Sequence, residues 1–421
     1  MANTFLQKTA KGFLLRLMRS LYTFGIRLYT FAIRVAAIFN VKAKDWVDGR
    51  KNLFIAFPDV KEKQVCWFHC ASLGEFDMAL PIMREIKQKR PETFLLVTFF
   101  SPSGMQHYNK REHVADFVTY LPSDTKGNAR KFIAHFSPKM VFFVKYEFWS
   151  NYIFEAKRKG VKVISVCTQL RKNQRFFKWY GGLFRDTLRS IDFFYTQNDQ
   201  TSLLLADIGI TTFQTVGDAR YDRVLQFKNT LQPDVRMMEF LSGQKAIVLG
   251  STWPDDEDIL IPFILSHPTN KFILAPHDIR EERIQQIEKK LPGITCRFTD
   301  DLLTRNVLIL NTIGNLSGAY SFGKWSYVGG GFSGKLHNIL EPSVFGLPVV
   351  FGPKFKRFPE AEQFLKHGTA FSVKTVDDLI DVAEHIELKE EAIKEKSIQN
   401  IYKNEGAAVK IIDHLIRRFN F

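Results

Sequence analysis

Residues 329–353 read GGGFSGKLHNILEPSVFGLPVVFGP, which joins a flexible turn, a carboxylate and an apolar run in one short stretch. Residues 325–329 predict a strand, and the glycines from Gly329 to Gly331 allow the following turn to bring backbone N–H groups close to an anion. Residues 337–345 follow helical spacing, and Gly346 with Pro348 ends that helix before the next apolar run. The stretch therefore predicts a strand–turn–helix–strand unit of a parallel α/β sheet.

Polar side chains within this unit point to a nucleotide-sugar site. Glu341 lies about one turn into the predicted helix, where its carboxylate could accept hydrogen bonds from both hydroxyls of a ribose. The preceding turn, with Gly331, would hold a phosphate. An alternative interpretation is a glycine-rich connection in which Asn338 caps the helix and Glu341 is solvated. The residues alone leave both interpretations open.

Apolar strand-like runs alternate with helical patterns along most of the chain. The predicted strands cover residues 65–70, 93–100, 116–121, 140–144, 161–166, 192–196, 246–249, 271–275, 306–310, 325–329 and 348–351. Helical patterns at 78–89, 126–136 and 149–159 lie between them, as in a doubly wound parallel sheet.

The polar residues 223–245 interrupt this alternation, and a chain of 421 residues is long enough for two domains. We therefore expect an α/β protein with two Rossmann-like domains, residues 45–230 and 231–421. Ligands are expected at the strand C-termini, facing a cleft between the domains.

Residues 1–44 form a separate basic and apolar segment. It holds eight of the fifteen excess positive charges and no acidic residue: Lys8, Lys11, Arg16, Arg19, Arg27, Arg34, Lys42 and Lys44. On a helix, Arg16, Arg27 and Arg34 project from nearly one line, with Arg19 beside it. No uninterrupted apolar run reaches the roughly 18 residues of a spanning helix. We expect an amphipathic helix in the interface of an anionic leaflet on the cytoplasmic side. A tilted span, or a helix packed on the protein's own core, are the alternatives.

Other function classes fit the composition less well. The net charge of +15 is compatible with nucleic-acid binding, but its concentration in an apolar segment favours a membrane surface over nucleic acid. No P-loop or dinucleotide fingerprint is present. The four cysteines do not form a disulfide framework at this length, so a reducing compartment is expected. Cys66, His69 and Cys70 are better explained by a buried strand than by a metal site.

Two loops after predicted strands in the first half carry charged residues. Glu75 follows the first strand at a helix start, where the helix dipole by itself would lower its pKa. It is placed either as a base for a hydroxyl acceptor or as a helix cap. Lys145 and Glu147 follow the fourth strand, where packing does not explain their charges.

Strand-end loops in the second half carry further candidates for ligand binding. Ser251 and Thr252 follow one strand and offer hydroxyls near a helix start, and Pro276 and His277 follow the next. Residues 313–315, which are Ile313, Gly314 and Asn315, precede the strand that enters the glycine turn. Convergence of these loops with Asn338 and Glu341 predicts a nucleotide pocket.

The motifs in this order resemble those of 3-deoxy-D-manno-octulosonic acid (Kdo) transferases. The resemblance rests on ASLGEF at 71–76, SPSG at 101–104, EFW at 147–149, GSTW at 250–253, APHD at 275–278, GN at 314–315 and GGGFSGKLHNILEP at 329–342. It implies a GT-B glycosyltransferase fold, CMP-Kdo as donor and a lipid A precursor (lipid IVA) as acceptor. It also implies peripheral or monotopic attachment to the cytoplasmic face of the inner membrane.

The resemblance also implies roles for single residues. Glu75 would be the base that deprotonates the acceptor hydroxyl. The CMP-binding positions carry over to Pro276, His277, residues 313–315, Asn338 and Glu341. Three positions depart from the family pattern: Lys145 replaces an acidic residue, His277 replaces an arginine, and Arg220 stands for a lysine. Lys145, Glu147 and Arg220 join Glu75 as candidate catalytic residues.

The expected chemistry is one displacement that inverts the anomeric centre, in contrast with the double displacement of retaining enzymes. An activated donor makes a metal or other cofactor dispensable, and none is expected. The remaining alternatives are a GT-B enzyme that uses a UDP-sugar and a basic nucleic-acid-binding protein.

Overall fold

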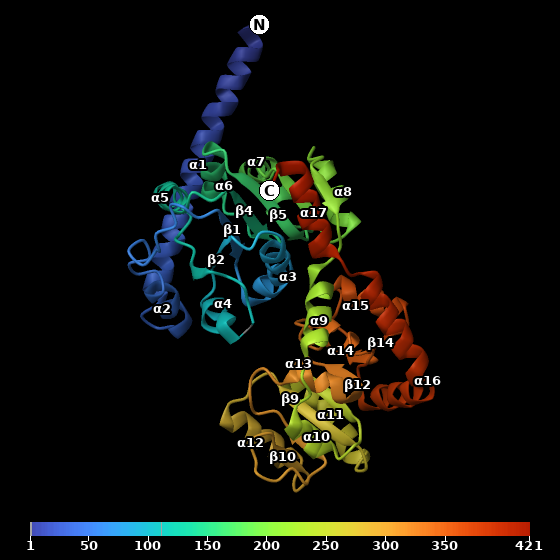
Figure 1. Cartoon of the computed structure of the whole chain (residues 1–421). Coiled ribbons are helices and arrows are strands. Elements are labelled where there is room, and N and C mark those ends of the chain that lie inside the picture. The colour runs from blue at the N-terminus through green and yellow to red at the C-terminus, as the bar shows by residue number, and fades with distance from the viewer. Residues whose placement is uncertain (1, 111) are drawn as a thin grey trace. The chain divides into compact units, whose positions relative to one another are not determined.

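The computed structural model describes the backbone of residues 2–110 and 112–421 and, in this part, the side chains from Leu17 onward. The chain divides into two compact units (Figure 1). Unit 1 comprises Met1–Arg223 with Glu405–Phe421, and unit 2 comprises Val224–Asn404. The division departs from the expected domains at the C-terminus, because Glu405–Phe421 packs into unit 1.

Unit 1 is built on a parallel sheet of seven strands within the described residues, in the order β3-β2-β1-β4-β5-β6-β7. Its strands are β1 (Val65–Cys70), β2 (Phe94–Phe99), β3 (Phe117–Tyr120), β4 (Met140–Val144), β5 (Lys162–Thr168), β6 (Phe193–Thr196) and β7 (Phe213–Thr215). All residues of β1 and β4 are buried, because helices cover both faces of the sheet.

Two helices of unit 1 precede the first strand, others connect the strands, and the last one returns from the end of the chain. They are α1 (Ala2–Ala36), α2 (Val41–Asp48), α3 (Leu73–Lys89), α4 (Pro102–His107), α5 (Lys126–Phe136), α6 (Ser150–Arg158), α7 (Gly182–Arg189), α8 (Asp199–Asp207) and α17 (Ala407–Phe419), with short 3-10 turns η1 (Tyr108–Lys110) and η2 (Arg175–Phe177). Asp222 fixes the start of α17, since its carboxylate accepts from Gly406 N at 2.6 Å and from Ala408 N at 2.8 Å.

Unit 2 repeats this architecture, and all of its residues are described. Its seven parallel strands follow the order β10-β11-β9-β8-β12-β13-β14. They are β8 (Ala246–Thr252), β9 (Lys271–Pro276), β10 (Thr295–Arg297), β11 (Val307–Ile309), β12 (Gly323–Val328), β13 (Val349–Phe351) and β14 (Ala370–Ser372). Its helices are α10 (Val235–Leu241), α11 (Pro254–Ser266), α12 (Glu281–Lys290), α13 (Leu316–Ala319), α14 (Leu340–Ser343), α15 (Pro359–Lys366) and α16 (Val376–Lys403), with η3 (Tyr320–Phe322); α9 (Ala219–Thr230) crosses the boundary between the units.

Two features of the predicted secondary structure are wrong. The polar stretch 223–245 contains most of α9 and all of α10 rather than a break in regular structure. The predicted helix 337–345 is reduced to α14, because Asn338 Oδ1 accepts from Leu340 N at 3.2 Å and starts the helix late. Gly346 then ends the segment with φ of +84°.

Each sheet has one point at which the strand order reverses direction. In unit 1 this point lies between β1 and β4, and in unit 2 it lies between β8 and β12. The crevice at the carboxyl ends of such a strand pair is where doubly wound sheets bind ligands. Glu75 and Lys145 follow the first pair, and Ser251 and Gly329 border the second.

Candidate active site

The charged residues predicted from the first half of the sequence lie within electrostatic range of each other in unit 1. The charges of Glu147 and Lys145 both act on Glu75, and the charges of Arg220 and Glu75 act on Lys145. Arg220 also forms an ion pair with Asp218 at 2.6 Å. The structure thus brings all four candidate catalytic residues together at the carboxyl end of one sheet.

Glu75 is buried at the first turn of α3, where it is 7% exposed. Its Oε2 accepts a hydrogen bond from Ser72 N at 3.0 Å, so the helix-cap interpretation describes a bond that exists. Burial, followed by the charge of Glu147, raises the pKa of Glu75 to about 7, although Lys145 and the backbone bonds oppose the rise. Loss of hydration therefore outweighs the helix dipole, which by itself would lower this pKa. A carboxylate has two oxygens, so capping and proton transfer are compatible.

Lys145 has an unusual backbone for a lysine directly after a buried strand. Its φ is +68°, a left-handed conformation that L residues other than glycine seldom adopt. Its N–H donates to Val166 O at 2.9 Å, which fixes the turn. Burial lowers the pKa of the Lys145 amine, and the charge of Arg220 adds to this effect. Strained backbone of this kind is concentrated at functional sites.

The loop after β4 is anchored through Trp149 and His69. Trp149 Nε1 donates to His69 Nε2 at 2.8 Å, which leaves the proton of the neutral imidazole on Nδ1, 3.0 Å from Thr98 Oγ1. Burial lowers the pKa of His69 to about 3. Among the residues that the structure describes, no group of three or more His, Cys, Asp or Glu side chains is placed to hold a metal ion.

The glycine turn of unit 2 is fixed by close packing. A Cβ at Gly329 would lie 2.2 Å from Ser251 O, and Gly330 has φ of +88°. The N–H groups of these two glycines are used inside the protein: Gly329 N donates to Gly250 O, and Gly330 N donates to Asp256 Oδ2, both at 2.9 Å. The expectation that these two N–H groups face a phosphate is wrong, because one pairs with strand β8 and the other with the Asp256 carboxylate of α11.

Glu341 is held by two side-chain donors at the start of α14. Ser317 Oγ donates to its Oε2 at 2.7 Å, and Asn338 Nδ2 donates to its Oε1 at 3.1 Å. Ser317 belongs to α13, directly after the turn 313–315, in which Gly314 has φ of +104° and Asn315 accepts from Thr312. The Ser317 bond therefore joins two of the predicted donor-site segments, residues 313–315 and residues 338–341, and no sequence motif pointed to this serine.

A cluster of one indole and two imidazole rings lies beside the glycine turn of unit 2. The Trp253 ring stacks on His277 with centroids 4.2 Å apart, and Trp253 Nε1 donates to His337 Nε2 at 3.1 Å. Burial lowers the pKa of His277 and lowers that of His337 to about 4, so both rings are neutral at pH 7. Lys335 Nζ lies 5.7 Å from the Trp253 ring centroid and brings a positive charge to the cluster. Trp253, His337 and Lys335 were not predicted as site residues.

Ser251, Thr252 and Pro276 are placed differently from one another. Ser251 is half-buried with φ of +55°, and Pro276 is a buried residue at the end of β9. Thr252 is 1% exposed, and its hydroxyl donates to Glu257 Oε1 at 3.2 Å. Glu257 in turn forms an ion pair with Arg283. The Thr252 hydroxyl therefore supports the start of α11.

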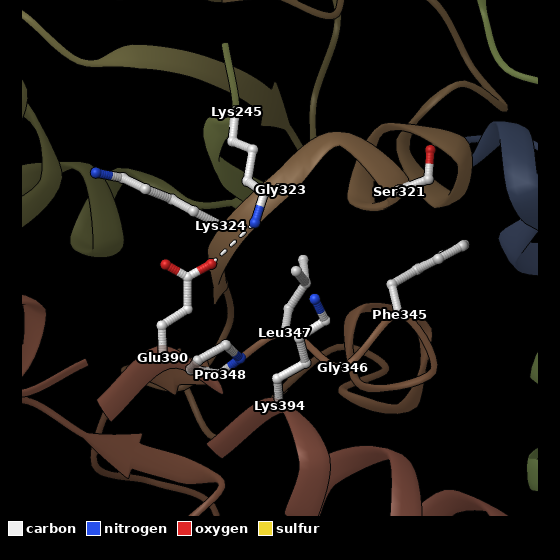
Figure 2. A pocket seen from close by; sticks show the side chains of 10 residues that line it. All are labelled: Lys245, Ser321, Gly323, Lys324, Phe345, Gly346, Leu347, Pro348, Glu390 and Lys394. Atoms are coloured by element: carbon white, nitrogen blue, oxygen red, sulfur yellow. Dashed lines mark hydrogen bonds and ion pairs between the residues drawn. The ribbon is translucent and has the colours of Figure 1, made fainter. Parts of the chain in front are cut away.

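Two cavities lie away from these charged groups. In unit 1, a cavity of about 530 Å³ beside α1 is lined by apolar groups and by Arg34, Arg50 and Lys51. Figure 2 shows a smaller pocket of about 100 Å³ in unit 2, at the starts of β8, β12 and β13. Its lysines have carboxylate partners, as in the pair Lys245–Glu390 at 3.0 Å. This pocket lies at the sheet end opposite the predicted donor loops.

Helix α1 turns its polar side toward unit 1 and its apolar side outward. Tyr22 donates to the buried Asp124 at 2.7 Å, and Asn151 donates to Thr23 at 3.2 Å. The large side chains on the other side are between 46% and 66% exposed: Leu17, Leu21, Phe24, Leu28, Phe31 and Val35. A surface helix in water normally has the opposite arrangement.

The basic line predicted on α1 is only partly correct. Arg27 and Arg34 are exposed, whereas the Arg19 guanidinium lies 3.6 Å from the Phe154 ring centroid and burial lowers its pKa. Lys8, Lys11 and Arg16 belong to the helix, but their side chains lie outside the described residues. In the part of the chain that is described, no helix is both long and apolar enough to cross a membrane.

Comparison with known proteins connects these features to a family. The family model for 3-deoxy-D-manno-octulosonic-acid transferase (kdotransferase) matches residues 49–223, which include Glu75, Lys145, Glu147 and Arg220. A 3-deoxy-D-manno-octulosonic acid transferase of Chlamydophila psittaci is 27% identical over 373 residues, covering 81% of this chain and 85% of its own. The similarity to Kdo transferases extends over about four fifths of the chain. A Kdo transferase of Aquifex aeolicus is also 27% identical, over 80% of this chain and 90% of its own.

Solved structures agree with the fold expected of a Kdo transferase. UDP-GlcNAc 2-epimerase from Neisseria meningitidis superimposes with a TM-score of 0.64 at 15% identity, covering 84% of this chain and 99% of its own. This likeness concerns the fold alone, which is GT-B with two Rossmann-like units. The similarity to Kdo transferases identifies the protein as a glycosyltransferase.

Proposed function

We propose that this protein transfers Kdo from CMP-Kdo to a lipid A precursor such as lipid IVA, in the assembly of the lipopolysaccharide core. The observation that carries this proposal is the buried Glu75, whose pKa is raised to about 7 beside Lys145 and Glu147 within the family match. A carboxylate with a pKa near the working pH is suited to accept a proton during a reaction. The test combines purified protein, CMP-Kdo and tetraacylated lipid A precursor, with products identified by mass spectrometry.

Glu75 would act as the general base in one displacement. It takes the proton of the acceptor hydroxyl as the hydroxyl oxygen attacks C2 of Kdo, and the bond from C2 to the CMP phosphate breaks. The attack comes from the face opposite CMP, so the anomeric centre inverts. Kdo and CMP are both anionic, and Lys145 and Arg220 provide cationic groups near the base. The expectation that this step needs no metal remains a prediction.

The donor would bind in unit 2 through the segments that meet at Glu341. A carboxylate oxygen has two acceptor positions, so Glu341 can keep its bonds from Ser317 and Asn338 and still accept ribose hydroxyls. Because His277 is neutral at pH 7, it would donate a hydrogen bond to the CMP phosphate rather than neutralise it. Lys335 would supply the charge.

Glu341→Ala is expected to weaken CMP binding by roughly tenfold or more, the value of one to two hydrogen bonds to a charged group. The ribose contact exists in the ground state and in the transition state, so the Michaelis constant for CMP-Kdo should rise more than turnover falls. Calorimetric titration with CMP measures the first effect. Ser317→Ala is the matched control, since it removes a donor to Glu341 but leaves the carboxylate in place. Normal CMP affinity in Glu341→Ala would exclude the ribose role.

A UDP-sugar enzyme is the alternative that the fold itself permits. Binding of CMP and UDP to the same preparation separates the two proposals, because a cytidine site should prefer CMP. Preference for UDP would exclude CMP-Kdo as donor.

Helix α1 would hold the enzyme on the cytoplasmic face of the inner membrane as a peripheral or monotopic anchor. The exposed apolar side of α1 would lie among the lipids, and Arg27 and Arg34 would meet anionic headgroups. The cavity beside α1, lined by apolar and polar side chains and by three cations, would suit a phosphorylated lipid.

Replacing Phe24, Leu28 and Phe31 with serine is expected to reduce binding to anionic vesicles by at least tenfold, since each side chain is about 60% exposed and its burial in lipid would be lost. The fold should persist, because the contacts of α1 with unit 1 lie on its other side. Vesicle sedimentation measures the effect. The control is Thr23→Val, which changes the packed side and should affect stability rather than binding. Unchanged vesicle binding in the triple variant would contradict the anchor role.

A further inference from the structure

The loop between β5 and α7 combines cations with exposed aromatic rings. Residues 169–182 read QLRKNQRFFKWYGG and include four cations and no acidic residue. Trp179 is 91% exposed and Tyr180 is 55% exposed, with their rings 5.6 Å apart in an edge-to-face arrangement. A tryptophan so fully exposed to water does not stabilise the fold by burial, and its ring is accessible to a binding partner.

This loop holds its aromatic rings outward by a defined set of bonds. Arg185 Nη1 donates to Lys178 O at 2.6 Å and to Phe176 O at 3.3 Å, and Gly181 N donates to Lys178 O at 2.9 Å. Gly181 is required at this turn, since a Cβ there would lie 2.1 Å from Arg175 O. A surface that is already ordered loses little entropy when it binds a partner.

The base of the loop packs against the loop that carries Glu147. Phe176 is 3% exposed, and its ring centroid lies 5.8 Å from that of Phe148. Burial raises the pKa of Glu147, and the charge of Arg175 opposes this rise. The exposed rings and the candidate catalytic loop are therefore parts of one packed structure.

On its other side the loop leads directly to α1. The ring of Phe184, at the start of α7, meets Tyr22 of α1 in an edge-to-face contact at 6.2 Å. A Cβ at Gly182 would lie 3.5 Å from Met18 Cε. The aromatic loop thus adjoins the part of α1 from which Leu17 and Leu21 project outward.

We propose that Trp179 and Tyr180 form a second membrane contact, which lies in the headgroup region of an anionic bilayer. Trp and Tyr favour this region because one part of each ring system is apolar and another forms hydrogen bonds. Lys172 and Lys178, together with the lack of acidic residues, match a negatively charged surface. The inference rests on the proposed action at a membrane. The inference adds that the bilayer contact lies on a loop packed against the loop of Glu147. The membrane surface would then fix the distance between the acceptor hydroxyl and the candidate catalytic residues.

The test compares Trp179→Ser/Tyr180→Ser with wild type on vesicles of phosphatidylethanolamine and phosphatidylglycerol, first without donor or acceptor and then in transfer assays with the acceptor embedded in the vesicles. Binding should weaken by about tenfold, and the Michaelis constant for a vesicle-embedded acceptor should rise while CMP affinity stays unchanged. The matched control is Leu388→Ser/Tyr402→Ser, which removes side chains that are 85% and 51% exposed in unit 2. Both substitutions in each variant lie on the surface, so both proteins should fold.

A second measurement detects the position of Trp179 directly. Brominated lipids quench tryptophan fluorescence at short range, so wild type should lose more fluorescence on such vesicles than Trp179→Phe does. Equal quenching in the two proteins, or unchanged vesicle binding in the double variant, would overturn the inference. If brominated lipids quench Trp179 but the protein does not transfer Kdo, the membrane contact is supported and the proposed reaction is rejected.

Discussion

Glu75→Gln is expected to lower turnover by roughly 10²-fold or more, the usual loss when a general base is removed. Glutamine keeps the size of the side chain and can also occupy this position of a capping box, but it cannot take a proton from the acceptor. CMP binding should stay near wild type, because Glu75 belongs to unit 1 and the proposed ribose contact to unit 2. Single-turnover transfer assays and CMP titration measure the two quantities.

Two controls separate the base from a helix cap. Glu75→Asp should recover only part of the activity, since a shorter side chain moves the carboxylate out of hydrogen-bond reach. In wild type, the acid limb of the activity profile should fall near pH 7, following the raised pKa of Glu75, and not near its ordinary value of 4.5. If Glu75→Gln remained fully active, the base would have to be sought at Glu147, whose pKa is also raised by burial.

The same substitution should change stability in a direction that a simple cap would not. The folded-state pKa of Glu75 is about 7, above its ordinary 4.5, so the folded protein binds a proton between these values that the unfolded chain releases. This contribution to stability is complete below pH 4.5 and is lost as the pH rises through 7. Glu75→Gln, which stays neutral, should therefore melt at a higher temperature than wild type above pH 7, and this advantage should vanish in acid.

The interior of both sheets could be predicted from the sequence because buried parallel strands leave continuous apolar runs. The three strands that were missed, β7, β10 and β14, have three residues each and lie at sheet edges, where burial is incomplete. The last helix lies in unit 1 because its apolar face, with Ile411, Ile412 and Leu415, is buried in the core of that unit, and Asp222 holds its start across 184 positions of the chain.

The candidate positions near strand ends, Glu75 and Glu147, could be located from the sequence, whereas Glu341 was located from the motif that surrounds it. The electrostatics of the site could not be predicted, because the pKa of Glu75 depends on burial by segments distant in sequence. Ser317 and Lys335 were missed because single polar residues carry no spacing signal. The helical spacing of α1 identified an amphipathic helix, but only the packing of Tyr22 and Thr23 shows that the apolar side faces outward.

Asp256 is the buried carboxylate that holds the glycine turn to the start of α11. It is fully buried, and its Oδ2 accepts from Trp253 N and from Gly330 N, each at 2.9 Å. Its Oδ1 accepts from Tyr327 Oη at 2.9 Å. Burial raises the pKa of Asp256, while these three bonds favour the ionised form.

Asp256→Ala is expected to lower the free energy of unfolding of unit 2 by about 3 kcal/mol or more, because three buried donors lose their acceptor. CMP binding should weaken with it, since the turn loses its link to the helix that carries Trp253 and its stack on His277. Calorimetric unfolding and CMP titration measure both effects. Asp255→Ala is the matched control: this exposed neighbour in the same helix turn should cost only about 0.3–1 kcal/mol through the helix dipole. Equal losses in the two variants would show that Asp256 acts merely as a helix-start charge, whereas a loss confined to Asp256→Ala would show that one buried carboxylate fixes the shape of the donor site.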